Sequence, residues 1–283
     1  MMKSCFQSFL CFSAFSVFTF SALAQAENVA VHPTSGTKST TGQENSKEFP
    51  STGAKSAHLL NIIKTNLTSI LLKNYSLQYE RVLSRKFSAA LQYRLMPESG
   101  LPFKSSLVKL AAANEDDNAK KLIEDFKMSN YAITPEVRLY LSKKGYGRGF
   151  YIGAYYRYAS FTSNDFNVFY TDDNNTEQSI KLSGKLTANT GGILLGVQHF
   201  WGKRVVLDVW ILGPHYGSGT GNFIGVSSKP LSENEQNDLR DQLDNIDIPL
   251  TEKTINVNAN GASLKLDGPW GGFRTGLSLG IKL

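Results

Sequence analysis

The chain has 283 residues, of which 41% are hydrophobic, and its 30 Lys and Arg against 24 Asp and Glu give a formal net charge of +6. The cations are scattered and form no basic run, so we expect no nucleic-acid partner. Both cysteines, Cys5 and Cys11, lie close to the N-terminus. The rest of the chain therefore has no disulfide or thiol chemistry with which to stabilise a fold or catalyse a reaction.

The N-terminal segment has the pattern of a secretory signal peptide. Lys3 precedes an apolar run, and Ala24-Gln25-Ala26 provides a small-residue cleavage site before Glu27. We therefore predict a signal peptide over residues 1–26. Residues 27–57 are polar, rich in Ser, Thr and Gly, and without periodicity, which predicts a flexible N-terminal segment. The main domain is predicted over residues 58–283.

Residues 58–283 alternate apolar and polar side chains, as β-strands with two different faces do. The last stretch, "FRTGLSLGIKL", places Phe273, Leu277 and Ile281 on one face and Arg274 and Lys282 on the other. No run of about 18 apolar residues follows residue 27, so transmembrane helices are not expected there. Eight strands are predicted, at 60–71, 75–83, 87–96, 130–141, 149–161, 187–201, 204–216 and 273–283.

The connections between these strands alternate in length. Residues 84–86, 142–148 and 202–203 form short turns, whereas residues 97–129, 162–186 and 217–268 form long loops. Strands about as long as a tilted bilayer crossing, joined by short turns on one side and long loops on the other, are typical of outer-membrane barrels. We therefore predict an all-β fold: an eight-stranded antiparallel transmembrane β-barrel in the cell outer membrane, with short periplasmic turns, extracellular loops and both termini in the periplasm.

Aromatic residues on the predicted lipid-facing parity cluster near the strand ends. Such clusters form belts at the two membrane interfaces, where amphipathic rings are favoured. The predicted belts are formed by Phe87, Phe150 and Trp201 at the short-turn ends, and by Tyr75, Tyr93, Tyr131, Tyr158 and Phe273 toward the long-loop ends.

The opposite parity carries charged residues into the predicted lumen. Eight strands enclose an interior that side chains nearly fill, and buried charges must be paired, so we expect a lumen closed by salt bridges. The alternative is a narrow gated channel, which would favour small anions because cations outnumber anions. The predicted lumen charge network contains Lys64, Glu80, Arg94, Glu136, Arg138, Arg157, Asp208, Arg274 and Lys282.

Catalytic and metal-binding motifs are weak in this sequence. A lipid-modifying enzyme at the barrel rim would need a His/Ser/acid arrangement, but alternation places His215 and Ser218 on opposite faces and no acid is fixed by spacing. The acidic stretch 171–177 lacks EF-hand spacing. We therefore predict no catalytic residues, no metal site and no cofactor.

The long loops are the expected sites of interaction. Residues 105–127 have a helical pattern, and residues 232–245 begin with a Ser232/Glu235 capping box. We expect outer-membrane lipid around the barrel, an extracellular or envelope protein partner at the loops, and a monomer. Pro135 breaks the pattern, because proline cannot donate a ladder hydrogen bond, and predicts a bulge or a water-linked gap in its strand.

The hairpin "NIIKTNLTSILLKNYSLQYERVLSRKFSAALQYRLMP", the strand "GFYIGAYYRYASF" and the ending "GGFRTGLSLGIKL" resemble an uncharacterised family of small outer-membrane β-barrel proteins of Gram-negative gut bacteria. The architecture is similar to OmpA/OmpX-type barrels, although the chain ends on Leu283 and not on the Phe common in such barrels. The resemblance implies a fold and a location but no activity. The predicted function is a structural, adhesive or surface-interaction role without catalysis.

Overall fold

The computed structural model describes residues 60–283, except residues 101–103, 106–107, 110–125, 247 and 249. The predicted signal peptide (1–26) and flexible segment (27–57) lie outside the described residues, as does most of the predicted helix at 105–127. The described chain is all-β apart from short helical segments. None of its helices has both the length and the hydrophobicity needed to cross a bilayer.

The described strands form one antiparallel sheet in which most strands pair with their neighbours in sequence. This order follows from short connections, which favour antiparallel pairing of consecutive strands. The strands are β1 (Leu60–Asn66), β2 (Tyr75–Val82), β3 (Phe87–Gly100), β4 (Lys127–Tyr140), β5 (Gly149–Thr171), β6 (Glu177–Trp201), β7 (Val205–Val226), β8 (Glu252–Asn258) and β9 (Gly261–Lys282).

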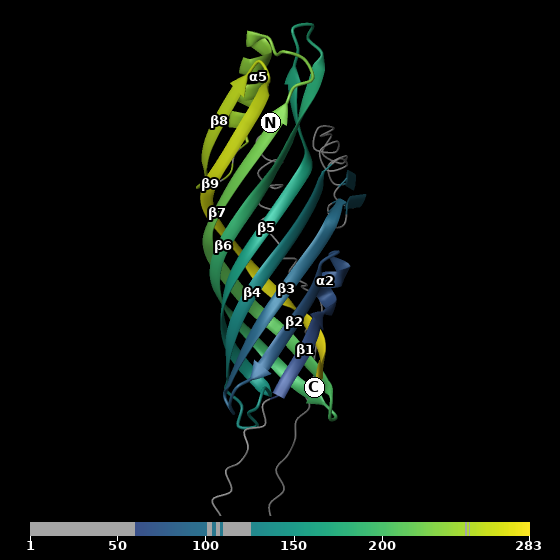
Figure 1. Cartoon of the computed structure of the whole chain (residues 1–283), viewed down its shortest axis with the longest axis vertical. Coiled ribbons are helices and arrows are strands. Elements are labelled where there is room, and N and C mark those ends of the chain that lie inside the picture. Colours follow the sequence, from purple (N-terminus) through teal and green to yellow (C-terminus); the bar gives the residue numbers. More distant parts are fainter. Residues whose placement is uncertain (1–59, 101–103, 106–107, 110–125, 247, 249) are drawn as a thin grey trace, which may run out of the picture. The chain divides into compact units, whose positions relative to one another are not determined.

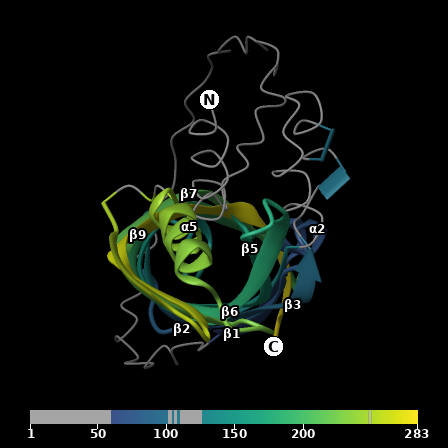
Figure 2. The same ribbon diagram turned by 90° about the horizontal axis from the view of Figure 1, so that it is seen from above.

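Eight of these strands close into a ring (Figures 1 and 2). The closure is the pairing of β1 with β9, in which Ile62 lies opposite Lys282 and Asn66 opposite Ser278. β8 pairs only with β9 and lies outside the ring order. The predicted eight-stranded antiparallel arrangement is confirmed. Because β1 and β9 pair with each other, neither strand is a free edge of the sheet along their shared segment.

The predicted short turns all lie at one end of the ring, here called the turn end, where β1 also begins and β9 finishes (Figure 1). The turns that join β2 to β3 and β4 to β5 contact each other, because the N–H of Tyr146 donates to the carbonyl of Arg85 over 2.8 Å. Tyr146 has φ of 51°, a left-handed conformation flanked by glycines at 145 and 147 that also have positive φ. The opposite end, which carries the helix α5 (Glu233–Asp244) and β8, is called the cap end (Figure 1).

The first predicted strand, 60–71, is too long. It ends at Asn66, and residues Leu67–Leu71 form the short helix α2. The side chain of Asn66 accepts a hydrogen bond from the N–H of Ser69, which starts a helix where sheet pairing would otherwise continue. Gly276 on β9 allows this turn to approach, since a Cβ there would lie 2.6 Å from Thr68 Oγ1.

The predicted long loops 162–186 and 217–268 are wrong in large part. β5 and β6 continue toward the cap end and are joined only by residues 172–176, and β7 and β9 extend in the same way. The predicted helix is present as α5 (Glu233–Asp244), with the Ser232/Glu235 capping box formed. The sequence does not reveal these strand extensions, because their apolar side chains fall on the inward-facing parity, whereas in the rest of the ring the apolar side chains fall on the outward-facing parity.

Of the two features predicted at Pro135, a bulge or a water-linked gap, the bulge is absent, whereas a gap in the pairing is present. Pro135 lies opposite Leu91 of β3 in an uninterrupted register. On its other side, pairing with β5 is interrupted between Ile133 and Glu136, yet the register is the same before and after the interruption. The missing N–H therefore leaves a gap in one ladder without shifting either strand.

Two zones of opposite polarity divide the strands along their length. In the half of β6 nearer the turn end, Ile193 is 56% exposed on the outer face. In the cap half of the same strand, Lys181 and Lys185 are exposed outside while Leu182 is fully buried inside. β9 changes in the same way, from exposed Ile281 to exposed Lys265. On β6 and β9 the turn half is apolar outside and polar inside, and the cap half is polar outside and apolar inside. On β7 the cap half keeps two exposed apolar residues on its outer face, Ile224 and Val226.

Candidate functional site

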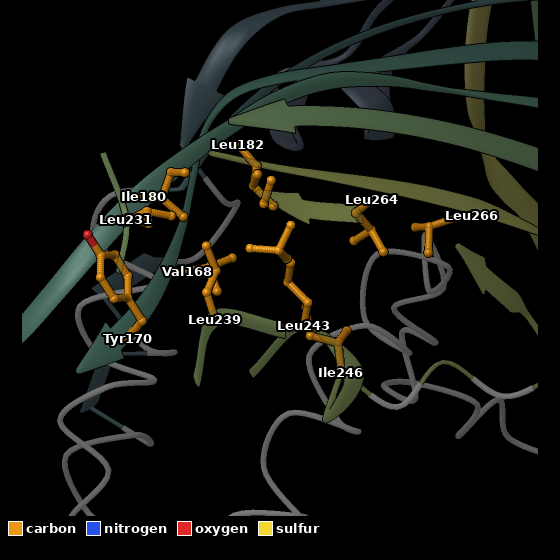
Figure 3. Close-up of a cluster of buried hydrophobic side chains, with 12 residues drawn as sticks. Val168, Tyr170, Ile180, Leu182, Leu231, Leu239, Leu243, Ile246, Leu264 and Leu266 are labelled. Carbon is orange, nitrogen blue, oxygen red and sulfur yellow. The ribbon is translucent and has the colours of Figure 1, made fainter. Parts of the chain in front are cut away.

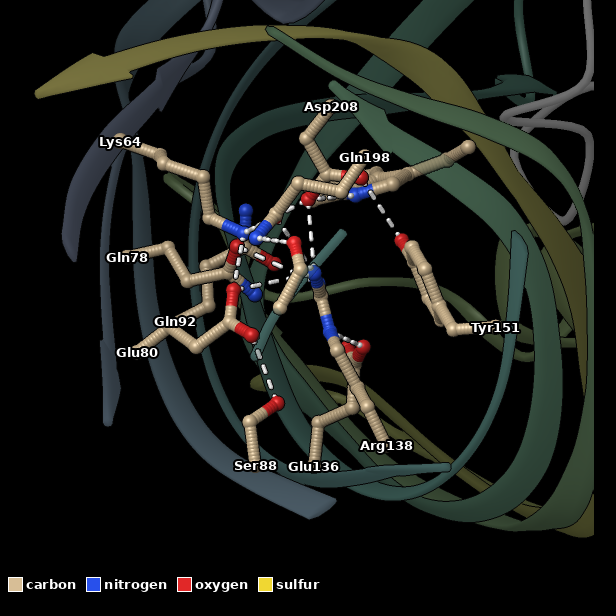
Figure 4. A network of polar contacts seen from close by, with 12 residues as sticks. Lys64, Gln78, Glu80, Ser88, Gln92, Glu136, Arg138, Tyr151, Gln198 and Asp208 are labelled. Atoms are coloured by element: carbon tan, nitrogen blue, oxygen red, sulfur yellow. Dashed lines mark hydrogen bonds and ion pairs between the residues drawn. The ribbon is translucent and has the colours of Figure 1, made fainter. Parts of the chain in front are cut away.

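The interior of the turn half contains a cluster of charged side chains with almost no exposure (Figure 4). Lys64 extends from β1 across the ring toward two carboxylates. Its Nζ donates to Glu80 Oε2 over 2.5 Å and to Asp208 Oδ2 over 2.6 Å. Gln198 Oε1 accepts a third bond of 2.8 Å, so all three N–H groups of the ammonium are used.

Arg138 of β4 is the second cation of this cluster. Its Nη1 lies 2.7 Å from Asp208 Oδ2 and 3.2 Å from Glu80 Oε2, and its Nε lies 2.6 Å from Glu136 Oε1. The guanidinium carbon also lies 4.4 Å from the ring centre of Tyr151. One planar fork thus connects three carboxylates, an arrangement that lysine could not reproduce.

Hydroxyl and indole groups satisfy the remaining carboxylate oxygens. Glu80 Oε1 accepts from Ser88 Oγ and from Tyr140 OH, each over 2.6 Å. Asp208 accepts from Tyr151 OH over 2.8 Å and from Trp210 Nε1 over 3.2 Å. Buried carboxylates held by this many donors are fixed in position.

Arg274 of β9 extends the cluster toward the cap end. Its Nη1 lies 3.1 Å from Glu136 Oε2, and its Nη2 donates to Gln92 Oε1 over 2.9 Å. Its guanidinium carbon lies 4.4 Å from the ring centre of Tyr155 and 4.6 Å from that of Trp210. Arg274 thus contacts Glu136 directly, and Arg138 connects Glu136 to the other two carboxylates of the cluster.

The structure therefore brings six of the nine sequence-predicted lumen residues into one paired group, called the ion network. Three cations face three carboxylates, so its formal charge is zero. The remaining three, Arg94, Arg157 and Lys282, form no ion pair with any described residue, and Lys282 lies at the turn end of β9. The members of the ion network are Lys64, Arg138, Arg274, Glu80, Glu136 and Asp208.

The interior of the cap half is an apolar cluster that sequence reasoning missed (Figure 3). α5 lies within the outline of the ring when viewed along it (Figure 2) and contributes fully buried Leu239 and Leu243. We call α5 and the strand segments around it the cap layer. Its buried members are Val168, Tyr170, Ile180, Leu182, Leu231, Leu239, Leu243, Ile246, Val257, Ala262, Leu264 and Leu266.

Polar contacts order the chain within the cap layer and within the turn between β5 and β6. Lys229 Nζ donates to Glu235 Oε1 over 2.9 Å, and this bond raises the pKa of Lys229. In the turn between β5 and β6, the N–H groups of Thr176 and Asn174 donate to Asp172, which lowers the pKa of that carboxyl. The acidic stretch 171–177 is therefore a tight turn.

The weak catalytic and metal candidates are not brought together. His215 faces the interior, where its Nδ1 lies 3.2 Å from Tyr155 OH, whereas Ser218 is exposed on the outer face. Within the described residues, no three His, Cys, Asp or Glu side chains are grouped closely enough to hold a metal ion.

The aromatic residues predicted to form two belts all lie on the outer face of the ring. Phe150 is 61% and Trp201 75% exposed near the turn end. The apolar outer face of the turn half is called the apolar zone. Tyr131 and Tyr158 lie toward its border with the cap half, with ring centres 6.1 Å apart. The outer apolar surface is thus bounded at both sides by aromatic rings. The other predicted belt residues, which are also exposed, are Tyr75, Phe87, Tyr93 and Phe273.

Comparison with known proteins finds one family. A family model described as "Protein of unknown function (DUF3575)" matches residues 51–219, which is more than half of the chain and spans most of the ring. No curated protein and no solved structure matches the chain significantly.

Proposed function

This chain belongs to the DUF3575 family, whose function is unknown, and we propose that it is an outer-membrane β-barrel that presents its cap layer at the cell surface. In this proposal the cap layer contacts an extracellular or envelope protein, the interior conducts no solute, and no reaction is catalysed. The origin from gut bacteria and the relationship to OmpA/OmpX-type barrels remain predictions.

The observation that carries the membrane assignment is the reversal of polarity along single strands. Apolar side chains stabilise a fold by leaving water, so an apolar outer face with a charged interior is favourable in lipid and costly in water. The cap half has the opposite pattern, which suits an aqueous surface. The aromatic rings at both borders of the apolar zone support the same placement.

Orientation follows from the same division. The turn end carries the short connections, the beginning of β1 and the end of β9, so we assign it to the periplasm together with both termini. The cap half is then extracellular. The N-terminal segment with the features of a signal peptide supports export, and a ring closed by β1 and β9 supports a monomer.

The ion network favours a closed interior over the alternative of a gated anion channel. Lys64, Arg138 and Asp208 each have a fully buried side chain, and their mutual contacts span the ring. A conducting path would require breaking paired, desolvated charges, which costs several kcal/mol. The separation of His215 from Ser218 likewise favours a protein without catalysis over a rim-located lipid-modifying enzyme.

The proposal is tested by labelling single cysteines in intact cells. In this proposal the signal peptide, with Cys5 and Cys11, is removed on export. Asn174→Cys in the β5–β6 turn and Lys203→Cys in the β6–β7 turn then each provide one reactive site. A membrane-impermeant maleimide should label Asn174→Cys in intact cells, and Lys203→Cys only after the outer membrane is permeabilised. Equal labelling of both before permeabilisation, or recovery of the protein in the soluble periplasmic fraction, would contradict the proposal.

A further inference from the structure

A second group of cations lies in the ring interior between the ion network and the cap layer. Arg94 of β3 and Arg157 of β5 are both on the inward-facing parity of their strands. Arg157 is only 7% exposed, yet no described carboxylate lies within ion-pair distance of either side chain. Among the residues that the structure describes, Arg94 Nη2 donates to the amide oxygen of Asn130 over 3.2 Å, and the buried Nε of Arg94 has no partner.

Contacts of Arg274 show that the two arginines lie at one level of the ring. Arg274 donates to Gln92, the inward residue next to Arg94 on β3, and lies over the ring of Tyr155, the inward residue next to Arg157 on β5. Successive inward residues on a strand are about 7 Å apart. Arg94 and Arg157 therefore each lie one inward step from a residue that Arg274 contacts.

These positive charges are not balanced within the described chain. The ion network already uses Arg274 and has a formal charge of zero, so Arg94 and Arg157 add two uncompensated positive charges. Buried cations are costly unless they are paired and hydrogen-bonded. Arginine forks match the geometry of oxyanions and hold them by charge-assisted hydrogen bonds.

We propose that Arg94, Arg157 and Arg274 form an anion-binding site that takes a doubly charged oxyanion of the phosphate class. The charge of a phosphate dianion equals the excess of two in the described interior. The amide of Asn130 lies beside Arg94, and His215 lies beside Tyr155, so both can provide neutral contacts. The site depends only on the ring interior and not on the membrane placement proposed above.

The test uses protein refolded in a phosphate-free detergent. Its thermal unfolding is followed in sodium phosphate and in sodium chloride at equal ionic strength. Bound phosphate should raise the midpoint by roughly 5 °C at a hundredfold excess over Kd. Arg157→Gln should abolish this rise, whereas Arg204→Gln, an exposed arginine in the β6–β7 turn, should keep it. Glucose 1-phosphate shows which kind of ligand the site accepts. A similar rise in the midpoint with this compound indicates that the site takes the phosphate group of a larger molecule, and no rise indicates that it takes only the free ion.

The state without phosphate provides a second measurement. If the site is empty, Arg157→Gln removes repulsion between arginines, so the variant should unfold at the same or a higher temperature than the parent in chloride. A lower midpoint in chloride would mean that Arg157 is already paired and would overturn the proposal. An equal phosphate effect in the parent and in Arg157→Gln, or no effect in the parent, would overturn it as well.

Discussion

Removal of the guanidinium of Arg138 should unbalance the ion network more than any exposed substitution. Arg138→Met keeps a long side chain but leaves three carboxylates with two cations. At 2.7 Å from Asp208 and 2.6 Å from Glu136, each gross attraction is about 6 kcal/mol at an effective dielectric constant of 20. Relief of the buried cation's desolvation offsets much of this, and breaking such a group costs a net ~3–5 kcal/mol.

The assay is urea unfolding of the refolded protein in lipid vesicles, followed by heat-modifiable mobility on gels. Arg138→Met should lower the free energy of unfolding by that amount, whereas Arg204→Gln should change it by less than about 0.5 kcal/mol. The double variant Arg138→Met/Asp208→Asn restores the charge balance and should recover part of the loss. A loss below about 1 kcal/mol in the single variant, or a double variant less stable than the single one, would refute the paired network.

Two further predictions concern the cap layer and the packing of the interior. Leu239→Ala empties a fully buried position on α5 and should destabilise the cap layer by about 2–5 kcal/mol, seen as faster amide hydrogen exchange in α5, with exposed Asp241→Ala as an unaffected control. Gly192→Ala places a Cβ 2.6 Å from Tyr155 Cζ and should cost about 1–3 kcal/mol in urea unfolding, whereas Gly191→Ala next to it has open space and should not. Equal exchange rates, or equal tolerance of both alanines, would contradict the packing described.

The alternating pattern predicted the strands of the turn half well, because apolar and polar residues there fall on opposite faces without interruption. The short turns were also predictable, since their Gly, Lys and Ser residues interrupt the pattern sharply. Helix α5 was recognised from its capping box alone. In each case a local signal, either a period of two or a cap, agrees with the final structure.

The cap half could not be predicted in the same way. Ile180 and Leu182 face inward on β6, on the same parity that carries Gln198 nearer the turn end. One face of this strand is therefore polar in the turn half and apolar in the cap half, so the apolar residues cannot be assigned to one face along its whole length. The helix at Leu67–Leu71 was missed because Thr65, Leu67 and Ser69 continue the alternation of β1, although the cap at Asn66 is visible in the sequence.

For the interior, parity identified which charged residues face inward but not which of them meet. Arg94, Arg138 and Arg157 have the same sequence character on neighbouring strands. Only the register, which aligns Arg138 with Ser88 and Gly153, places one of them among the carboxylates and leaves the others apart. Which of the inward charges are paired could therefore be established only from the three-dimensional structure.

The most direct test of the account is a spin-label scan along the outer face of β6 in lipid vesicles. Labels at Ser179→Cys and Lys185→Cys lie in the cap half, and labels at Ile193→Cys and Leu195→Cys lie in the apolar zone. Collisions with oxygen report lipid, and collisions with a water-soluble nickel complex report water. The account predicts that oxygen dominates at 193 and 195 and nickel at 179 and 185. Strong nickel accessibility at all four positions would contradict it.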